Sequence, residues 1–280
     1  MKKQHTLQKD SLFLLPSLTG VCIFVLIPFA DVARRSFTTL GGSRFIGLQN
    51  YRTVWGNAAF QLALGNTLKF LGISLPLLLA LSLLLANLAY FGGMGLYRNF
   101  CLLPMAVPTA ALVFVWKALF HQSGAINSFF HISIDWLHSS HAFAVLTASF
   151  LWKNMGYYVI LWATGLENIP KSLYEASSLD GAGPFAQFWH ITLPGLKPMA
   201  SAVFTLALAG AFKSYRESYL LAGEYPDKSI YMVQHMFHNW FRDMAMDKMY
   251  AAAVVIVCLF AVLVYPLRKK GGGNLDSFHA

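Results

Sequence analysis

Charged residues are scarce in this 280-residue sequence. Asp, Glu, Lys and Arg make up only 12% of it, whereas a soluble domain usually carries about 25%. Hydrophobic residues reach 56%, and the mean hydropathy is +0.52. A chain this apolar cannot cover its surface with polar groups, so it requires lipid as its solvent. The scarcity of charge therefore excludes an ordinary soluble domain.

Cysteine is also rare. The three cysteines, Cys22, Cys101 and Cys258, all lie in apolar runs and form no disulfide or metal-binding pattern. We therefore expect them to be small residues of the core. The histidines between residues 121 and 141 have no spacing typical of metal ligands either, so no metal site is predicted.

Two further absences bear on function. The sequence has no glycine-rich loop with the lysine that binds nucleotide phosphates, so we expect no ATP or other cofactor in this chain. It has only twelve Asp and Glu, and they are scattered, whereas a membrane-embedded enzyme would need acids clustered at one membrane face. We attribute the net charge of +9 to residues that flank spans and contact anionic headgroups, not to a nucleic-acid partner.

Long uncharged runs are abundant, and they predict an all-α polytopic membrane protein. The runs are continuous rather than alternating, so helices are favoured over a barrel, and each is close to the roughly 20 residues that cross a bilayer. Six transmembrane helices are expected, at about Leu12–Val32, Thr67–Leu88, Phe100–Phe120, Phe143–Gly165, Met199–Leu220 and Met249–Leu267. Pro104 and Pro108 should bend the third.

The chain is expected to be a single transmembrane domain, residues 1–280, because no loop is long enough to build its own core. Residues 1–33 resemble a signal peptide in their basic start and apolar core, but the apolar stretch is longer than usual, which favours a retained first span. An even number of spans places both termini on one side, and the basic tails favour the cytoplasm.

One segment, residues 166–198, is unusually rich in glycine and proline for its apolar surroundings. Leu166, Ile169, Leu173 and Ala176 repeat at helical spacing and predict one apolar face. Gly181 and Gly183 should then break the helix, since glycine accepts backbone angles that other residues resist. Pro184 is expected to open a second helix, with Phe185, Phe188 and Trp189 on a second apolar face. This second helix is expected to end at Leu193-Pro194. Two interpretations stay open: a loop lying on headgroups, or a dock for a soluble partner.

The sequence "EASSLDGAGPFAQFWHITLP" closely resembles the EAA motif of ABC importer permeases, E-A-A-x-x-D-G-A followed by I-x-L-P. Ser177 stands where that family more often has alanine. "FIGLQNY", "GLENIPKSLYEA" and, more loosely, "FKSYRESYLLAGEYP" also resemble stretches of the carbohydrate-uptake class. The resemblance covers most of the chain from Leu12 to Leu267, in the half similar to the maltose- and glycerol-3-phosphate-type first permease.

The resemblance implies a type I ABC importer permease fold in the bacterial inner membrane. It implies a second permease subunit of the same family, two cytoplasmic ATP-binding subunits that bind the ATP, and an extracytoplasmic solute-binding protein that delivers a sugar-like substrate. Residues 166–198 would be the cytoplasmic coupling loop. The ATPase-coupling residues implied are Glu175, Ala176, Ser177, Asp180, Gly181, Ala182, Phe185 and Phe188.

Charges inside the spans are candidates for the substrate path. Lys153 lies near the middle of the fourth span, where a lipid-facing charge is least tolerable. Three roles stay open for Lys153: it lines the substrate path, it forms a buried structural ion pair, or it extends its charged end to the membrane surface. The candidate path residues are Lys153, Asn154, Tyr157, Lys213, Tyr215 and Arg216. Lys213 and Glu217 are four residues apart and are expected to pair along the helix. Trp116, Tyr157, Trp162 and Tyr215 are either sugar-stacking platforms or core and interfacial residues.

The leading hypothesis is thus half of the translocation pathway of an importer for a sugar or oligosaccharide. A glycerol phosphodiester or a uronate-containing glycan is an alternative solute. An autonomous secondary transporter should show internal repeats and broken spans carrying ion ligands, which the sequence does not show.

Overall fold

The structure is a computed structural model that describes residues 14–39, 42–92 and 103–271. In these residues it is almost entirely helical, and the one β feature among them is an antiparallel bridge between Thr38 and Phe45. The chain forms two compact units, residues 1–61 with 237–261, and residues 62–236 with 262–280.

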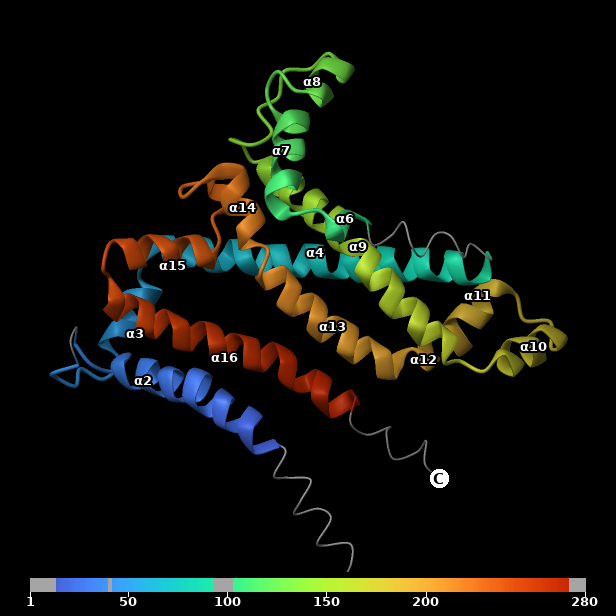
Figure 1. The fold of residues 1–280 in the computed structure, drawn as a ribbon, viewed down its shortest axis with the longest axis horizontal. Helices are drawn as coiled ribbons and strands as arrows, with labels where there is room; N and C mark the ends of the chain where they lie inside the picture. The colour runs from blue at the N-terminus through green and yellow to red at the C-terminus, as the bar shows by residue number, and fades with distance from the viewer. Residues whose placement is uncertain (1–13, 40–41, 93–102, 272–280) are drawn as a thin grey trace, which may run out of the picture. The chain divides into compact units, whose positions relative to one another are not determined.

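The described helices are short at the turns of the chain and long where it is apolar (Figure 1). In chain order they are η1 (Cys22–Leu26, a π-helical turn), α2 (Ile27–Arg35), α3 (Gln49–Trp55), α4 (Ala58–Phe91), α6 (Leu103–Ala106), α7 (Thr109–Phe120), α8 (Ala125–Phe130), α9 (Ala142–Glu167), α10 (Lys171–Leu179), α11 (Pro184–Gln187), η2 (Phe188–Thr192, π-helical), α12 (Leu193–Gly195), α13 (Lys197–Phe212), α14 (Tyr215–Ala222), η3 (Lys228–Ile230), α15 (Val233–Arg242) and α16 (Met246–Gly271).

Three described helical stretches are long and apolar enough to cross a membrane: Leu15–Arg35, Ala58–Phe91 and Met246–Tyr265. A fourth results if Pro184–Gly195 and Lys197–Ala222, bent by 72° at their junction, count as one span. The helix α9 has 26 residues, but Lys153 and Asn154 in its middle make it less apolar. The six predicted spans are therefore not all confirmed, and the start of the third lies outside the described residues.

Two of the predicted spans are broken, and the sequence predicted a bend only in the third. The third divides into α6 and α7 at Pro108, the residue directly before α7. The backbone of Pro108 is extended, with a ψ of 136°, which confirms the expected bend. The fifth divides into α13 and α14 at Lys213 and Ser214, without a proline. There the buried Ser214 hydroxyl donates a hydrogen bond to the Ala211 carbonyl at 2.7 Å, which satisfies a carbonyl at the end of α13.

In the first unit, the chain after α2 is held by the "FIGLQNY" stretch. The buried Asn50 side chain donates hydrogen bonds to the carbonyls of Ser36 (3.0 Å) and Thr38 (2.9 Å). The Tyr51 hydroxyl lies 2.7 Å from the Ser36 hydroxyl, and Gly47 has a positive φ of 60°. This stretch is therefore a structural clasp that fixes the turn after the first span.

Replacing Asn50 with leucine should destabilise this turn while keeping the side-chain volume. Two buried carbonyls would lose their donors, which costs about 2 kcal/mol. We expect a lower thermal midpoint and a lower yield of the membrane-inserted chain in detergent. Gln49→Leu is the matched control, because Gln49 is the preceding residue and is exposed. Equal midpoints for the two variants would contradict the structural role of Asn50.

In the second unit, α4 and α9 are joined through buried aromatic and polar contacts. The rings of Phe70 and Phe150 meet edge to face at 5.3 Å, and both side chains are almost fully buried. Closer to the other end of α9, the Trp162 indole donates a hydrogen bond to the Ser82 hydroxyl at 3.1 Å. Trp162 is therefore a core residue, one of the two roles the sequence left open.

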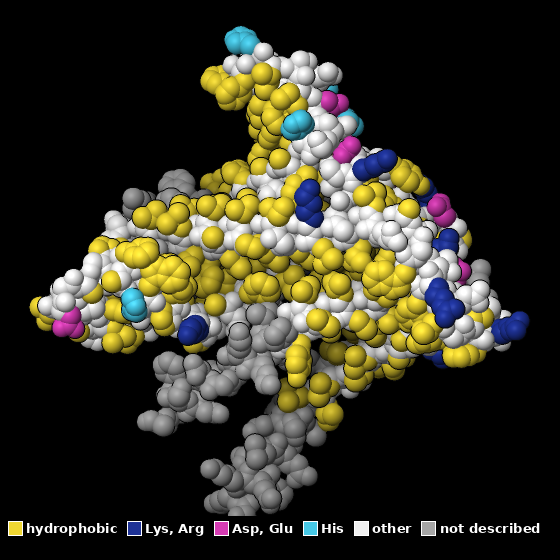
Figure 2. Space-filling model, turned by 180° about the vertical axis from the view of Figure 1, so that it is seen from behind, with side chains coloured by type: hydrophobic (Ala, Val, Ile, Leu, Met, Phe, Trp, Pro, Cys, Tyr) yellow, Lys and Arg dark blue, Asp and Glu magenta, His cyan; other side chains and the backbone are white. Residues whose placement is uncertain are grey.

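Large hydrophobic side chains are also plentiful on the surface. Figure 2 shows a face that is mostly hydrophobic, on which charged side chains are sparse. Cys22 and Cys258 are exposed, so the prediction that they lie in the core is wrong. In a chain whose solvent is lipid, apolar residues face outward as well as inward, and an apolar neighbourhood no longer indicates burial.

Candidate functional site

The two helix breaks and the middle of α9 surround a cavity of about 600 Å³ in the second unit. Backbone at a break in a span needs water or protein partners, so such breaks are tolerated where they line a cavity. The cavity is lined by Met105, Ala106, Val107, Pro108, Thr109, Ala110, Phe150, Lys153, Asn154, Gly210, Lys213, Ser214, Arg216 and Glu217.

An ion pair crosses this cavity. The Lys153 ammonium on α9 lies 2.5 Å from the Glu217 carboxylate on α14 and donates a second hydrogen bond to the Thr109 hydroxyl at 2.8 Å. The side chains are 18% and 14% exposed, so the pair is largely desolvated. Lys153 is thus both paired and at the cavity wall. The predicted pairing of Lys213 with Glu217 is wrong, because α13 ends at Phe212 and the two residues do not share a helix.

Four of the six predicted path residues meet at this cavity, namely Lys153, Asn154, Lys213 and Arg216. The Asn154 amide donates to the Phe150 carbonyl at 2.8 Å. Tyr157 and Tyr215 are not among the lining residues; the Tyr215 ring packs edge to face on His235 at 4.8 Å. The sequence did not predict Glu217 as a cavity residue. Its place there becomes apparent only from its ion pair with Lys153 on α9.

The segment 166–198 forms a helical hairpin, as predicted, with some shifted boundaries. Gly181 has a φ of +79°, and nothing lies within 4 Å of the position its Cβ would take, so the backbone angle and not the space requires glycine. Pro184 is the first residue of the second helix. That helix continues through η2 and α12, so Leu193-Pro194 does not end it as predicted.

A hydrogen-bond clamp, missed by the sequence reasoning, joins the two arms of the hairpin. The Gln187 amide donates to the hydroxyls of Ser177 (3.0 Å) and Ser178 (2.9 Å), and both hydroxyls donate in turn to the Tyr174 carbonyl. The buried Tyr174 hydroxyl lies 3.0 Å from the Thr192 hydroxyl. Ser177 is therefore more than a small substitute for alanine, because it takes part in the clamp.

The outer surface of the hairpin is exposed. Leu179 is 90% and Phe185 77% exposed, and Glu175, Ala176, Asp180 and Gly181 are exposed beside them. The predicted apolar face is only partly right: Leu166 and Ile169 are buried before α10 begins, whereas Leu173 and Ala176 are exposed and Tyr174 is the buried residue.

Phe188 behaves differently from Phe185. It is half-buried and lines a second cavity of about 370 Å³ together with the end of α4. This cavity is lined by Asn87, Leu88, Phe91, Gly92, Tyr174, Pro184, Gln187, Phe188 and Thr192. The second apolar face is thus divided between the protein's own core and the surface, while Ala182 is half-buried between the arms.

Two glycines fix the base of the hairpin to α9 and α13. A Cβ on Gly165 would lie 2.8 Å from the Leu196 side chain, and a Cβ on Gly195 would lie 2.8 Å from the Ile169 side chain. These approaches are too close for any other residue without rearrangement. Figure 1 shows α9 and α13 leading from this base toward the opposite end of the unit, where α7 and α14 lie.

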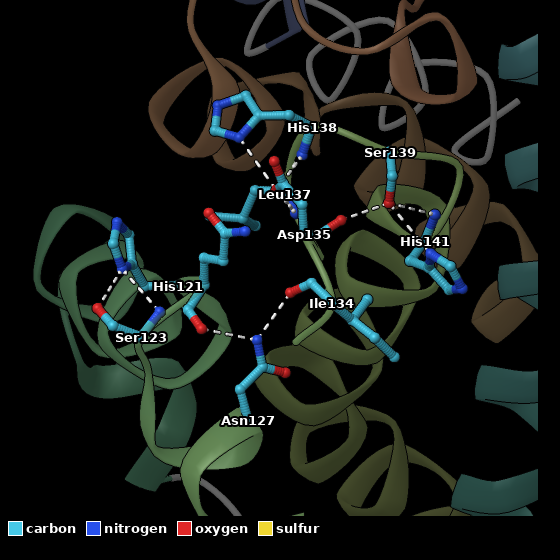
Figure 3. A network of polar contacts seen from close by, with 10 residues as sticks. His121, Ser123, Asn127, Ile134, Asp135, Leu137, His138, Ser139 and His141 are labelled. Carbon is cyan, nitrogen blue, oxygen red and sulfur yellow. Dashed lines mark hydrogen bonds and ion pairs between the residues drawn. The ribbon is translucent and has the colours of Figure 1, made fainter. Parts of the chain in front are cut away.

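At that opposite end, residues 121–141 are ordered by their own polar contacts (Figure 3). The Asn127 amide donates to the carbonyls of Gln122 and Ile134, and the Asp135 carboxylate accepts from the His138 backbone N–H at 3.0 Å. This backbone hydrogen bond holds the pKa of the exposed Asp135 carboxyl below its usual range. Within the described residues no group of three or more His, Cys, Asp or Glu is arranged to hold a metal ion.

With the cavity and the hairpin described, comparison with known proteins identifies the chain. Residues 79–268 match the family described as the binding-protein-dependent transport system inner membrane component. The chain belongs to this family. The match includes the hairpin and every charged residue of the cavity.

Individual members of this family of transport permeases are similar over nearly the whole chain. The arabinooligosaccharides transport system permease protein AraP of Bacillus subtilis (strain 168) is 32% identical over 91% of this chain and 85% of its own length. The trehalose/maltose transport system permease protein MalF of Thermococcus litoralis is 30% identical over 91% of each chain. These relatives are permeases and not enzymes, in line with the sequence.

A solved structure confirms the fold. The bacterial alginate ABC transporter, in complex with an alginate pentasaccharide-bound periplasmic protein, contains a chain with a TM-score of 0.77 and 19% identity. The likeness covers 99% of this chain and 98% of that one. The predicted ABC importer permease fold is therefore correct, and three of its described helices, or four with the bent pair, are long and apolar enough to span a membrane.

Proposed function

We propose that this permease is one half of the translocation pathway of a bacterial importer for a sugar or oligosaccharide. It lies in the inner membrane with both termini in the cytoplasm. It pairs with a second permease of the same family, with two cytoplasmic subunits that bind ATP, and with an extracytoplasmic solute-binding protein. Family membership, and the sugar and oligosaccharide names of its relatives, support this proposal.

The observation that carries the proposal is that the same two helices connect the hairpin and the charged cavity. The helix α9 holds Lys153 at the cavity and ends at the hairpin, and α13 leads from the hairpin to the break at Lys213. The clamp around Gln187 makes the hairpin rigid. A displacement of the hairpin by a partner therefore moves both walls of the cavity.

The exposed surface of the hairpin provides the contact with the ATPase. The α10 arm and the turn after it carry five of the coupling residues, namely Glu175, Ala176, Ser177, Asp180 and Ala182. Phe185 projects from the second arm. Exposed aromatic and aliphatic side chains beside a carboxylate are suited to a groove on a soluble partner. Phe188 would support the arm from below, since it is half-buried against the end of α4.

The decisive experiment is copurification with the ATP-binding subunits after this chain is coexpressed with its proposed partner subunits. We expect the assembled complex to hydrolyse ATP faster when the solute-loaded binding protein is added. Glu175→Ala should reduce recovery of the ATPase several-fold without reducing the inserted chain, whereas exposed Lys171→Ala on the same helix should not. In liposomes, the isolated chain should neither bind ATP nor move solute, and either activity would contradict the proposal.

A further inference from the structure

The charges at the cavity do not balance. Four ionisable side chains line it, Lys153, Lys213, Arg216 and Glu217, and Lys153 is neutralised by Glu217. Lys213 and Arg216 are left without an acidic partner among the described residues. On this basis we infer that the cavity selects saccharides that carry an anionic group, such as a carboxylate, over neutral ones. The inference rests on the proposed function and adds a charge preference to it.

The chemistry of the lining supports an oxyanion over a neutral ring. Arg216 carries a planar guanidinium that can hold a carboxylate through two parallel hydrogen bonds, and Lys213 adds a second positive charge three residues away. Neutral sugars are usually held by aromatic ring faces. Phe150 is the one aromatic residue in the lining, and it is only 2% exposed.

The position of the two cations also matters. Lys213 lies at the break between α13 and α14, and Arg216 lies in the first turn of α14, so neither is carried on an uninterrupted lipid-facing helix. Both side chains are exposed at the cavity, where an entering solute can reach them. Positive charges in a walled cavity raise the local concentration of anions, and the attraction is strongest where water is partly excluded.

The test compares uptake of matched acidic and neutral solutes by the assembled importer in proteoliposomes. The probes are paired saccharides, each uronate oligosaccharide beside its methyl ester, which has lost the charge and gained one methyl group per carboxylate. We expect the free acids to enter at least tenfold faster. Lys213→Gln and Arg216→Gln should each slow the acids about tenfold and leave the esters within twofold. Lys117→Gln is the control, since Lys117 is exposed on α7 outside the cavity lining.

The other outcomes overturn the inference in distinguishable ways. Equal uptake of acids and esters by the unmodified complex would show that the cavity has no charge preference. Loss of copurifying permease in the glutamine variants would assign the two cations to a subunit contact. Uptake of no saccharide at all, with ATP hydrolysis unstimulated, would contradict the proposed function as well as the inference.

Discussion

Uptake should be lost when Gly181 is replaced by valine, although the chain still inserts into the membrane. Gly181 has a φ of +79°, an angle that a β-branched residue adopts at a cost of about 1–3 kcal/mol. The turn between α10 and α11 would therefore rearrange, and the hairpin would lose its fixed shape. We expect transport to fall more than tenfold, with solute-stimulated ATP hydrolysis uncoupled or absent. The measurement is uptake per inserted chain on the same membranes.

A neighbouring glycine supplies the control. Gly183 lies two residues further on, but its φ is an ordinary −74° and nothing stands within 4 Å of its Cβ position. Gly183→Ala should therefore transport normally, while Gly181→Asn should keep part of the activity because asparagine tolerates positive φ. Normal uptake by Gly181→Val would show that the shape of this turn is not required for coupling.

The second large effect is expected at the ion pair across the cavity. Lys153→Met leaves the Glu217 carboxylate largely buried without its cation, and one of its oxygens already has no hydrogen-bond partner. An uncompensated charge of this kind costs about 2 kcal/mol here, less than for a fully buried pair, because both side chains keep some exposure. We expect the amount of assembled complex to fall several-fold, measured by copurification and thermal midpoint in detergent.

The double variant Lys153→Met/Glu217→Met separates the two roles of the pair. Removing both charges should restore assembly to near its original level, because no buried carboxylate remains unpaired. Uptake should stay low if Lys153 also contacts the solute, and should recover if the pair is only structural. Full assembly and full uptake by the single variant would contradict both roles and leave a tolerated lysine.

The hairpin was predictable where the backbone itself decides the conformation. Gly181 and Pro184 act through their own backbone angles, so their places at the turn and at the start of α11 follow from local sequence. The clamp was not predictable in the same way. Tyr174, Gln187 and Thr192 meet only after the two arms have folded together, and no local signal distinguishes them from other polar residues of the loop.

The cavity was harder to predict than the hairpin for two physical reasons. The partner of Lys153 lies 64 residues away, whereas the sequence favoured the nearby pair that a continuous helix would bring together. No proline marks the break between α13 and α14 in the sequence. Instead, the Ser214 hydroxyl donates a hydrogen bond to the Ala211 carbonyl at the end of α13. In addition, hydrophobic periodicity weakens in a lipid-facing helix, so it does not reveal which side of α9 faces the cavity.

The ion pair has a mechanical consequence. From Lys153 the chain runs down α9, around the hairpin, up α13 and into α14, where Glu217 returns to Lys153, so the pair closes a ring of chain. Without the ion pair, the chain could bend freely at the break between α13 and α14. A displacement of the hairpin would then be absorbed at Lys213 and Ser214. Because the ion pair bridges that break, a displacement of the hairpin would be transmitted to α9 and α14 together. In the proposed importer, we therefore expect the strength of this ion pair to determine how much of a movement imposed on the hairpin reaches the cavity.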